Sequence, residues 1–182
     1  MGQYYKPSIL KKNWKLAKNP VKKAADSWQF GCGLKLMEHS YCGNAFVNAV
    51  ALDLAMYHYG YPFVWCGDYA DEVENLVGTH DIYSCAEEAT EKFQECSERN
   101  PFKYLVNLTK KEYCRIPKWD GKEYYVHPLP LLTCSGNGRG GGDYGINDER
   151  VGSWAFDRIG VTNDEADIKG LKEISGFFEM DD

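Results

Sequence analysis

The sequence predicts a single compact α+β domain, in which an antiparallel sheet of about five or more strands packs with about two helices. The chain has 182 residues, of which 43% are hydrophobic and 14% aromatic. This length and composition predict one domain that spans residues 1–182 and has a sizeable hydrophobic core. Helical periodicity is confined to two stretches of the first hundred residues. The second half is instead rich in short alternating, β-branched and aromatic runs, which favour strands.

The N-terminal part predicts extended structure interrupted by a basic segment. Residues 3–10 predict a first strand, and residues 11–25 follow as a lysine-rich exposed excursion. Residues 27–30 and 34–41 are expected to be extended, on either side of a turn at Gly31-Cys32-Gly33.

Two helices are predicted. Residues 43–59 form the clearer one, with Asn44 as a plausible N-cap. Its apolar residues recur at spacings of three and four, as one buried face requires: Phe46, Val47, Val50, Leu54 and Tyr57. A second helix is expected over residues 85–99, where Ser84 and Glu87 form a capping box.

The remaining elements are predicted strands. Residues 63–66 suggest a short buried strand between the two helices. Asp120-Gly121 predicts a tight hairpin between the second and third strands of the later group. That group comprises residues 102–109, 112–116, 123–126, 129–134, 151–161 and 171–178, before an acidic tail at 179–182.

The net charge of −6 is distributed unevenly. Residues 1–25 contain seven lysines and no acidic residue, whereas the remaining chain holds 14 basic and 27 acidic residues, a net charge of −13. Ten carboxylates lie within residues 68–98 and seven within residues 164–182. Such runs form either an ordinary solvated surface or a negative face that meets a basic partner.

A glycine-rich run carries the most distinctive chemistry. Six of the ten residues 136–145 are glycine, and Arg139 and Asp143 lie among them. Successive backbone N–H groups with an arginine can hold an anion, but no phosphate-binding fingerprint is present, so a wide hairpin loop explains the run equally well. Asp68, which follows a predicted strand, fits either a cation site or a cap.

Cysteine and histidine spacings argue against a metal centre. The seven cysteines and four histidines form no pair with metal-ligand spacing. No secretory signal is recognisable, so we expect a cytoplasmic protein with reduced thiols. An enzyme alternative, a small phage-borne hydrolase or nucleotide-modifying protein, would use Asp68, His39 and Cys42 with the Arg139 loop.

The basic segment offers a further alternative, a DNA-associated accessory protein. Trp14 and Trp28 lie near lysines that suit phosphate contacts with DNA or guide RNA. These lysines are Lys11, Lys12, Lys15, Lys18, Lys22 and Lys23.

Several runs resemble a known group of proteins. They are MGQYYKP at the start, GLKLMEHS at 33–40, CGDYAD at 66–71, VNLTKKEY at 106–113 and the 136–144 loop. Together they resemble a family of small phage and mobile-element proteins of Firmicutes, and within it the type II-A anti-CRISPR inhibitors. The lysine-rich segment departs from the short turn expected there.

The resemblance implies a counter-defence protein that binds and inhibits a guide-loaded CRISPR effector nuclease in the bacterial cytoplasm. It implies no catalytic residue, no cofactor and no membrane contact. An acidic inhibitor suits a nuclease whose nucleic-acid channel is positively charged. The candidate partner-binding residues are Asp68, Asp71, Glu72, Glu74, Glu87, Glu88, Glu91, Arg139 and Asp143.

Overall fold

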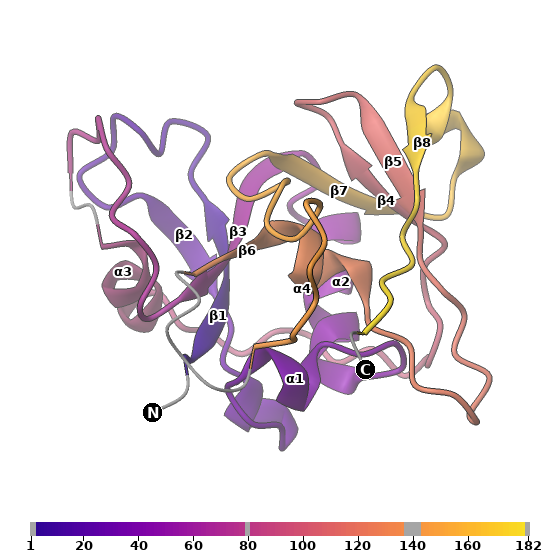
Figure 1. Ribbon diagram of the computed structural model, residues 1–182. Coiled ribbons are helices and arrows are strands. Elements are labelled where there is room, and N and C mark those ends of the chain that lie inside the picture. The colour runs from indigo at the N-terminus through magenta and orange to yellow at the C-terminus, as the bar shows by residue number, and fades with distance from the viewer. Residues whose placement is uncertain (1–2, 79–80, 137–142, 181–182) are drawn as a thin grey trace.

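The computed structural model describes residues 3–78, 81–136 and 143–180 and contains one eight-stranded mixed sheet (Figure 1). Seven strands follow the order β2-β1-β3-β7-β4-β5-β8, and β6 pairs with β3 off this path. Most pairs are antiparallel, whereas β3–β6 and β5–β8 are parallel. The strands are β1 (Tyr5–Leu10), β2 (Val21–Ala24), β3 (Tyr61–Gly67), β4 (Tyr104–Asn107), β5 (Glu112–Arg115), β6 (Cys134–Ser135), β7 (Arg158–Thr162) and β8 (Lys172–Ile174).

Four α-helices are present among the described residues: α1 (Leu36–His39), α2 (Ala45–Met56), α3 (Ile82–Glu88) and α4 (Pro128–Thr133). The α+β class is therefore confirmed: eight strands are compatible with the five or more expected, and the four α-helices exceed the two or so expected. No helix of the described part of the chain combines the length and apolar character needed to cross a membrane.

Helix α2 confirms the clearest prediction. The Asn44 side chain accepts hydrogen bonds from the backbone N–H groups of Phe46 and Val47, as an N-cap should. Residues on nearly every side of α2 are buried, because it lies in the main apolar cluster and packs against β7, α4 and the 3₁₀ helix at residues 27–30. That cluster also contains Trp65 and Trp154.

Two segments expected to be extended are helical. Residues 27–30 form a 3₁₀ helix, because the Asp26 side chain accepts from the Trp28 N–H and Gly31, at φ 71°, ends the turn. Residues 36–39 form α1, in which Leu36 and His39 are buried three positions apart. That spacing places both on one side of a helical turn.

The predicted strand at residues 129–134 is also wrong, since this segment forms α4. The His127 ring accepts from the Leu129 N–H, and Pro128 stands in the first turn, where its missing N–H has no cost. Every residue of α4 is buried. An apolar run buried on all sides carries no periodicity that separates a helix from a strand.

The second predicted helix is displaced and short. Helix α3 ends at Glu88, and Asp81 caps it in place of Ser84, whose N–H donates to Asp81 Oδ1 at 3.1 Å. After α3 the chain runs beside β2: Ala24 N–H donates to the Ala89 carbonyl and Glu91 N–H to the Ala24 carbonyl. Pairing with a strand edge therefore replaces the continuation of the helix.

The hairpin predicted at Asp120-Gly121 does not form, and residues 123–126 contribute only an isolated bridge between Val126 and Tyr41. Strand β5 pairs instead with β4 and β8. The β4–β5 turn is set by Asn107, whose side chain accepts from two following N–H groups. The later predicted strands shorten to β7 and β8, with residues 149–157 in turns.

The lysine-rich segment is held to the body of the protein. Residues 12–19 form turns and bends, and Val21–Ala24 forms the edge strand β2. Trp14 is buried and stacks on Phe156, with ring centroids 5.2 Å apart and an interplanar angle of 16°. Trp14 belongs to a second, smaller apolar cluster, which underlies α3 and the end of β3.

Candidate partner-binding surface

Two loops of opposite charge lie side by side at the α3 end of the molecule (Figure 1). The Val77 N–H donates to the Lys15 carbonyl at 3.0 Å. A Cβ on Gly78 would lie 2.3 Å from the Lys18 carbonyl oxygen, so only glycine permits this close approach without a shift of the backbone. The acidic loop after β3 is thereby fixed against the lysine-rich segment.

Six exposed carboxylates form what we call the acidic face. They come from the loop after β3, from the last turn of α3 and from the chain that follows: Asp71, Glu72, Glu74, Glu87, Glu88 and Glu91. None of the six forms an ion pair with a described residue. Carboxylates at a helix C-terminus meet the negative end of its dipole, so Glu87 and Glu88 are unfavourably placed for fold stability. We therefore find no ion pair with a described residue, and no favourable helix-dipole interaction, through which these carboxylates would stabilise the fold.

Asp68 differs from these residues because it is half-buried and bonded. Its Oδ1 accepts from the Tyr4 N–H at 2.9 Å, and its own N–H donates to the Tyr4 carbonyl at 2.9 Å. The side chain lines a cleft of about 170 Å³ with Asp71, Glu72 and Tyr83. Burial raises the pKa of Tyr83, and the carboxylate of Asp68 adds to the rise.

Asp143 lies near this cleft and is tied to the start of β1. Its Oδ2 accepts from Gln3 Nε2 at 3.2 Å. Burial raises the pKa of Asp143; contacts with the Tyr5 and Gln3 side chains oppose this rise, and the charge of Asp68 adds to it. The structure thus brings together the two acidic positions singled out from separate motifs, Asp68 and Asp143. Arg139 lies outside the described residues.

The candidate nucleic-acid lysines do not all remain free for phosphate contacts. Lys12 and Lys22 place their Nζ atoms 4.9 and 4.7 Å from the centre of the Tyr61 ring. Lys23 donates to Asp53 at 2.6 Å. Lys11 is half-buried, and Lys15 and Lys18 are exposed beside the acidic loop. Because Trp14 is buried, it is not available to stack on a base, whereas Trp28 is 68% exposed.

His39 and Cys42 lack the properties of catalytic groups. His39 is fully buried, its Nδ1 lies 2.9 Å from the Gly33 carbonyl, and its Nε2 accepts from Trp65. Burial lowers the pKa of His39 to about 4 and raises the pKa of the Cys42 thiol to about 12. Within the described residues, no three histidine, cysteine or acidic side chains are placed to hold a metal ion.

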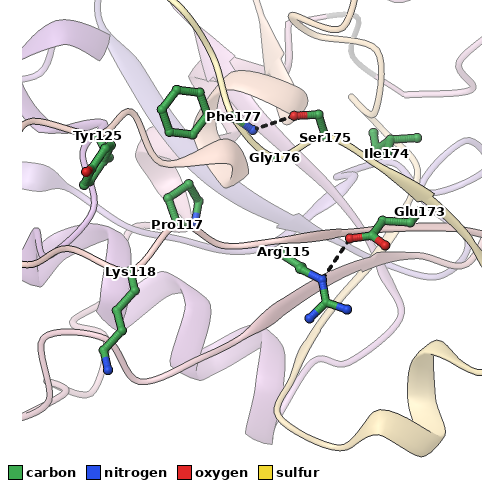
Figure 2. A pocket seen from close by; sticks show the side chains of 9 residues that line it. All are labelled: Arg115, Pro117, Lys118, Tyr125, Glu173, Ile174, Ser175, Gly176 and Phe177. Atoms are coloured by element: carbon green, nitrogen blue, oxygen red, sulfur yellow. Dashed lines mark hydrogen bonds and ion pairs between the residues drawn. The ribbon is translucent and has the colours of Figure 1, made fainter.

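A separate groove of about 450 Å³ lies at the β8 edge of the sheet, between the end of β5 and the C-terminal segment; Figure 2 shows its lining residues. Figure 2 shows Arg115 joined to Glu173, at 2.9 Å, on one side of the groove and Phe177 and Tyr125 on the other. Arg115 is already paired with Glu173, and the other lining residues include Lys118, Pro117 and Ile174, so the groove presents no single recognisable ligand chemistry.

Gln3, Tyr4 and Tyr5 are site residues that sequence reasoning missed. They lie more than 60 positions from Asp68 and about 140 from Asp143, and no local pattern links them to either residue. Pairing of β1 with β3, which aligns Tyr5 with Gly67, brings them to the site.

The fold and this surface define a small α+β protein with a concentrated acidic face and a neighbouring carboxylate cleft. Comparisons of the chain with protein-family models, curated proteins and solved structures found no match.

Proposed function

We propose that the protein is a non-catalytic inhibitor whose acidic face binds a basic surface of a nucleic-acid-processing protein. The carrying observation is that the six carboxylates of the acidic face are exposed and that none forms an ion pair with a described residue. Mutual repulsion of like charges costs the folded state free energy, and a cationic partner relieves it. Such charges chiefly raise the association rate and select the partner.

The proposed partner is a guide-loaded CRISPR effector nuclease in the cytoplasm of a bacterial host. The resemblance of the sequence to phage counter-defence proteins suggests this partner, and the charge of the acidic face is complementary to a nuclease channel that holds nucleic acid. DNA or guide RNA beside the nuclease would meet Lys15 and Lys18, the exposed lysines next to the acidic loop.

The geometry supports this binding function better than the enzyme alternative. That alternative requires a base and a nucleophile within reach of each other and of substrate. His39 has both ring nitrogens engaged in the core, and the buried Cys42 holds a thiol whose pKa is about 12. Asp68 is anchored to the backbone of Tyr4.

Association kinetics with the guide-loaded nuclease test the proposal. The triple variant Glu87→Lys, Glu88→Lys, Glu91→Lys should lower the association rate at least tenfold at low salt, with a smaller change in dissociation rate. The rate for the unmodified protein should fall steeply as salt rises, because the Debye length shortens to about 8 Å at physiological ionic strength. Inhibition of DNA cleavage should weaken in parallel.

A matched triple outside the acidic face provides the control. Glu149, Glu165 and Glu179 are exposed, and replacing them by lysine makes the same change of net charge away from the acidic face. Equal slowing by both triples would mean that net charge alone drives association. If the unmodified protein neither binds the nuclease nor alters cleavage at low salt, the nuclease is not the partner.

A further inference from the structure

A pocket of about 600 Å³ adjoins the acidic cleft and has a distinctive lining. Asp143 is the one charged residue among the described residues that line it, and Tyr5, Ser135 and Tyr144 supply further polar groups. Its remaining walls are largely apolar, with Leu131, Val151 and Phe156 among them. Pockets of this kind bind ligands with an apolar body and one polar head group.

The charge of Asp143 is not balanced by any described cation. The carboxylate accepts a hydrogen bond from Gln3 Nε2 and is also contacted by the Tyr5 side chain, while its Oδ1 is shielded from solvent and has no hydrogen-bond partner. No described lysine or arginine forms an ion pair with Asp143. A half-buried carboxylate is stabilised when a cation lies beside it.

Gln3 provides a second, independent indication of a missing donor. The side chain is fully buried, and its Oε1 has no hydrogen-bond partner. An ionised carboxylate only accepts hydrogen bonds, so the amide nitrogen must face Asp143 and the oxygen is the atom left over. A Cβ built on Gly136, a residue of the pocket wall, would lie 2.7 Å from this Oε1 and 2.5 Å from the Tyr5 hydroxyl. The Tyr5 hydroxyl, from a residue that lines the pocket, and Gln3 Oε1, which is shielded from solvent behind the lining, therefore both lie near Gly136.

An arginine side chain matches this arrangement. Its planar guanidinium offers five N–H donors to several acceptors at once, and its three-carbon stem is apolar. The stem would contact the apolar walls while the head group lies near Asp143. A lysine offers three donors on a strongly hydrated point charge.

We propose that this pocket receives an arginine side chain presented by the basic partner. The inference rests on the proposed function and adds the central contact to it. Ser135 and Phe156 line both this pocket and the cleft of Asp68, so the pocket is continuous with the acidic side of the molecule. An arginine buried in a pocket and surrounded by weaker rim charges is a common interface hot spot.

Titration of the isolated protein with butylguanidinium tests the pocket without the partner. Butylurea, its neutral near-isostere, is the control ligand, and Arg139→Ala is the background, so that this arginine of the chain cannot compete. Butylguanidinium should cause saturable NMR shifts at the backbone amides of Tyr5, Ser135 and Tyr144, and butylurea should not. Asp143→Asn should weaken binding at least tenfold, whereas Glu88→Gln, which removes the same charge from the acidic face, should change it less than twofold.

A second variant keeps the test decisive if Asp143→Asn does not fold. Ala155→Leu places a larger side chain in the pocket wall without changing charge and should also abolish the shifts. Equal shifts with butylurea, equal affinity for butylammonium, or unchanged affinity in both variants would overturn the proposal. Binding only in the Arg139→Ala background, and not in the unmodified protein, would make the chain's own arginine the occupant.

The nuclease assay separates failure of the pocket from failure of the proposed function. If the pocket receives the partner's arginine, Asp143→Asn should raise the dissociation rate of the complex at least tenfold, and butylguanidinium should compete with the nuclease. If neither Asp143→Asn nor butylguanidinium affects nuclease binding, the pocket does not receive the partner's arginine, whereas the proposed inhibitor function still holds. If the protein binds butylguanidinium but not the nuclease, the pocket accepts a guanidinium group and only the choice of the nuclease as partner is wrong.

Discussion

His39 and Trp65 share a hydrogen bond inside the core: Trp65 Nε1 donates to His39 Nε2 at 3.1 Å. Nε2 can accept only when it carries no proton, so the proton of the neutral ring lies on Nδ1, which donates to the Gly33 carbonyl at 2.9 Å. His39 is therefore a neutral link between α1 and β3, packed edge-on against Phe46.

Replacement of His39 by alanine should destabilise the fold without altering the acidic face. The change leaves a cavity and an unpaired buried Trp65 N–H, so the free energy of unfolding should fall by about 2–4 kcal/mol. Urea denaturation measures the loss. His39→Gln, whose amide oxygen can still accept from Trp65, should recover part of it. An unchanged midpoint in His39→Ala would contradict the structural role.

Stability should fall as the pH is lowered from 6.5 towards 4. Burial lowers the pKa of His39 to about 4 and that of His127 to about 3, so the unfolded chain binds two protons in this window that the folded chain does not. Each group then contributes a loss of about 1.4 kcal/mol per pH unit. Asp143, with its raised pKa, acts in the opposite direction at the acidic end of this range.

The variant His127→Asn isolates one of these titrations. Asparagine can still cap α4, as His127 does through its ring nitrogen. The dependence of the unfolding free energy on pH, measured by urea denaturation at several pH values, should become shallower by about 1.4 kcal/mol per pH unit. If the slope of unfolding free energy against pH is unchanged, His127 binds its proton as readily in the folded chain as in the unfolded chain.

The contact of Trp14 with Phe156 should carry much of the stability of the lysine-rich segment. Trp14→Ala removes a buried aromatic stack and should cost about 3–5 kcal/mol of unfolding free energy. Lys15→Gln, at the exposed neighbouring position, should cost less than about 0.5 kcal/mol. Thermal unfolding compares the two. Equal effects would mean that the segment contributes little to the folded domain.

Thiol reactivity should divide the seven cysteines into two groups. All seven are free, but only Cys32 and Cys96 are partly exposed. Burial raises the pKa of Cys42, Cys66 and Cys134 to about 12 and also raises the pKa values of Cys85 and Cys114. A thiol-specific reagent at pH 8 should therefore label two residues rapidly in the native protein and seven after denaturation, as mass spectrometry can count. Rapid labelling of Cys42 in the native protein would show that its thiol is reactive, contrary to this prediction.

The sequence and the structure agree where local signals are strong. The spacing from Phe46 to Leu54 and the cap at Asn44 define α2, and the alternation near residues 104–115 locates β4 and β5. They disagree where the signal is ambiguous. The run from Pro128 to Thr133 is apolar on every side, and only its cap at His127 distinguishes a helix from a strand.

By itself, the sequence determined the α+β class, the main helix and the exposed acidic residues, because periodicity and charge are local properties. Only the tertiary structure decided which of those residues meet. Gln3 reaches Asp143 across 140 positions, because β1 pairs with β3 and β3 pairs with β6, which leads into the glycine-rich run. Strand pairing over such distances leaves no pattern in a single sequence, since its energy comes from hydrogen bonds and burial that exist only after folding.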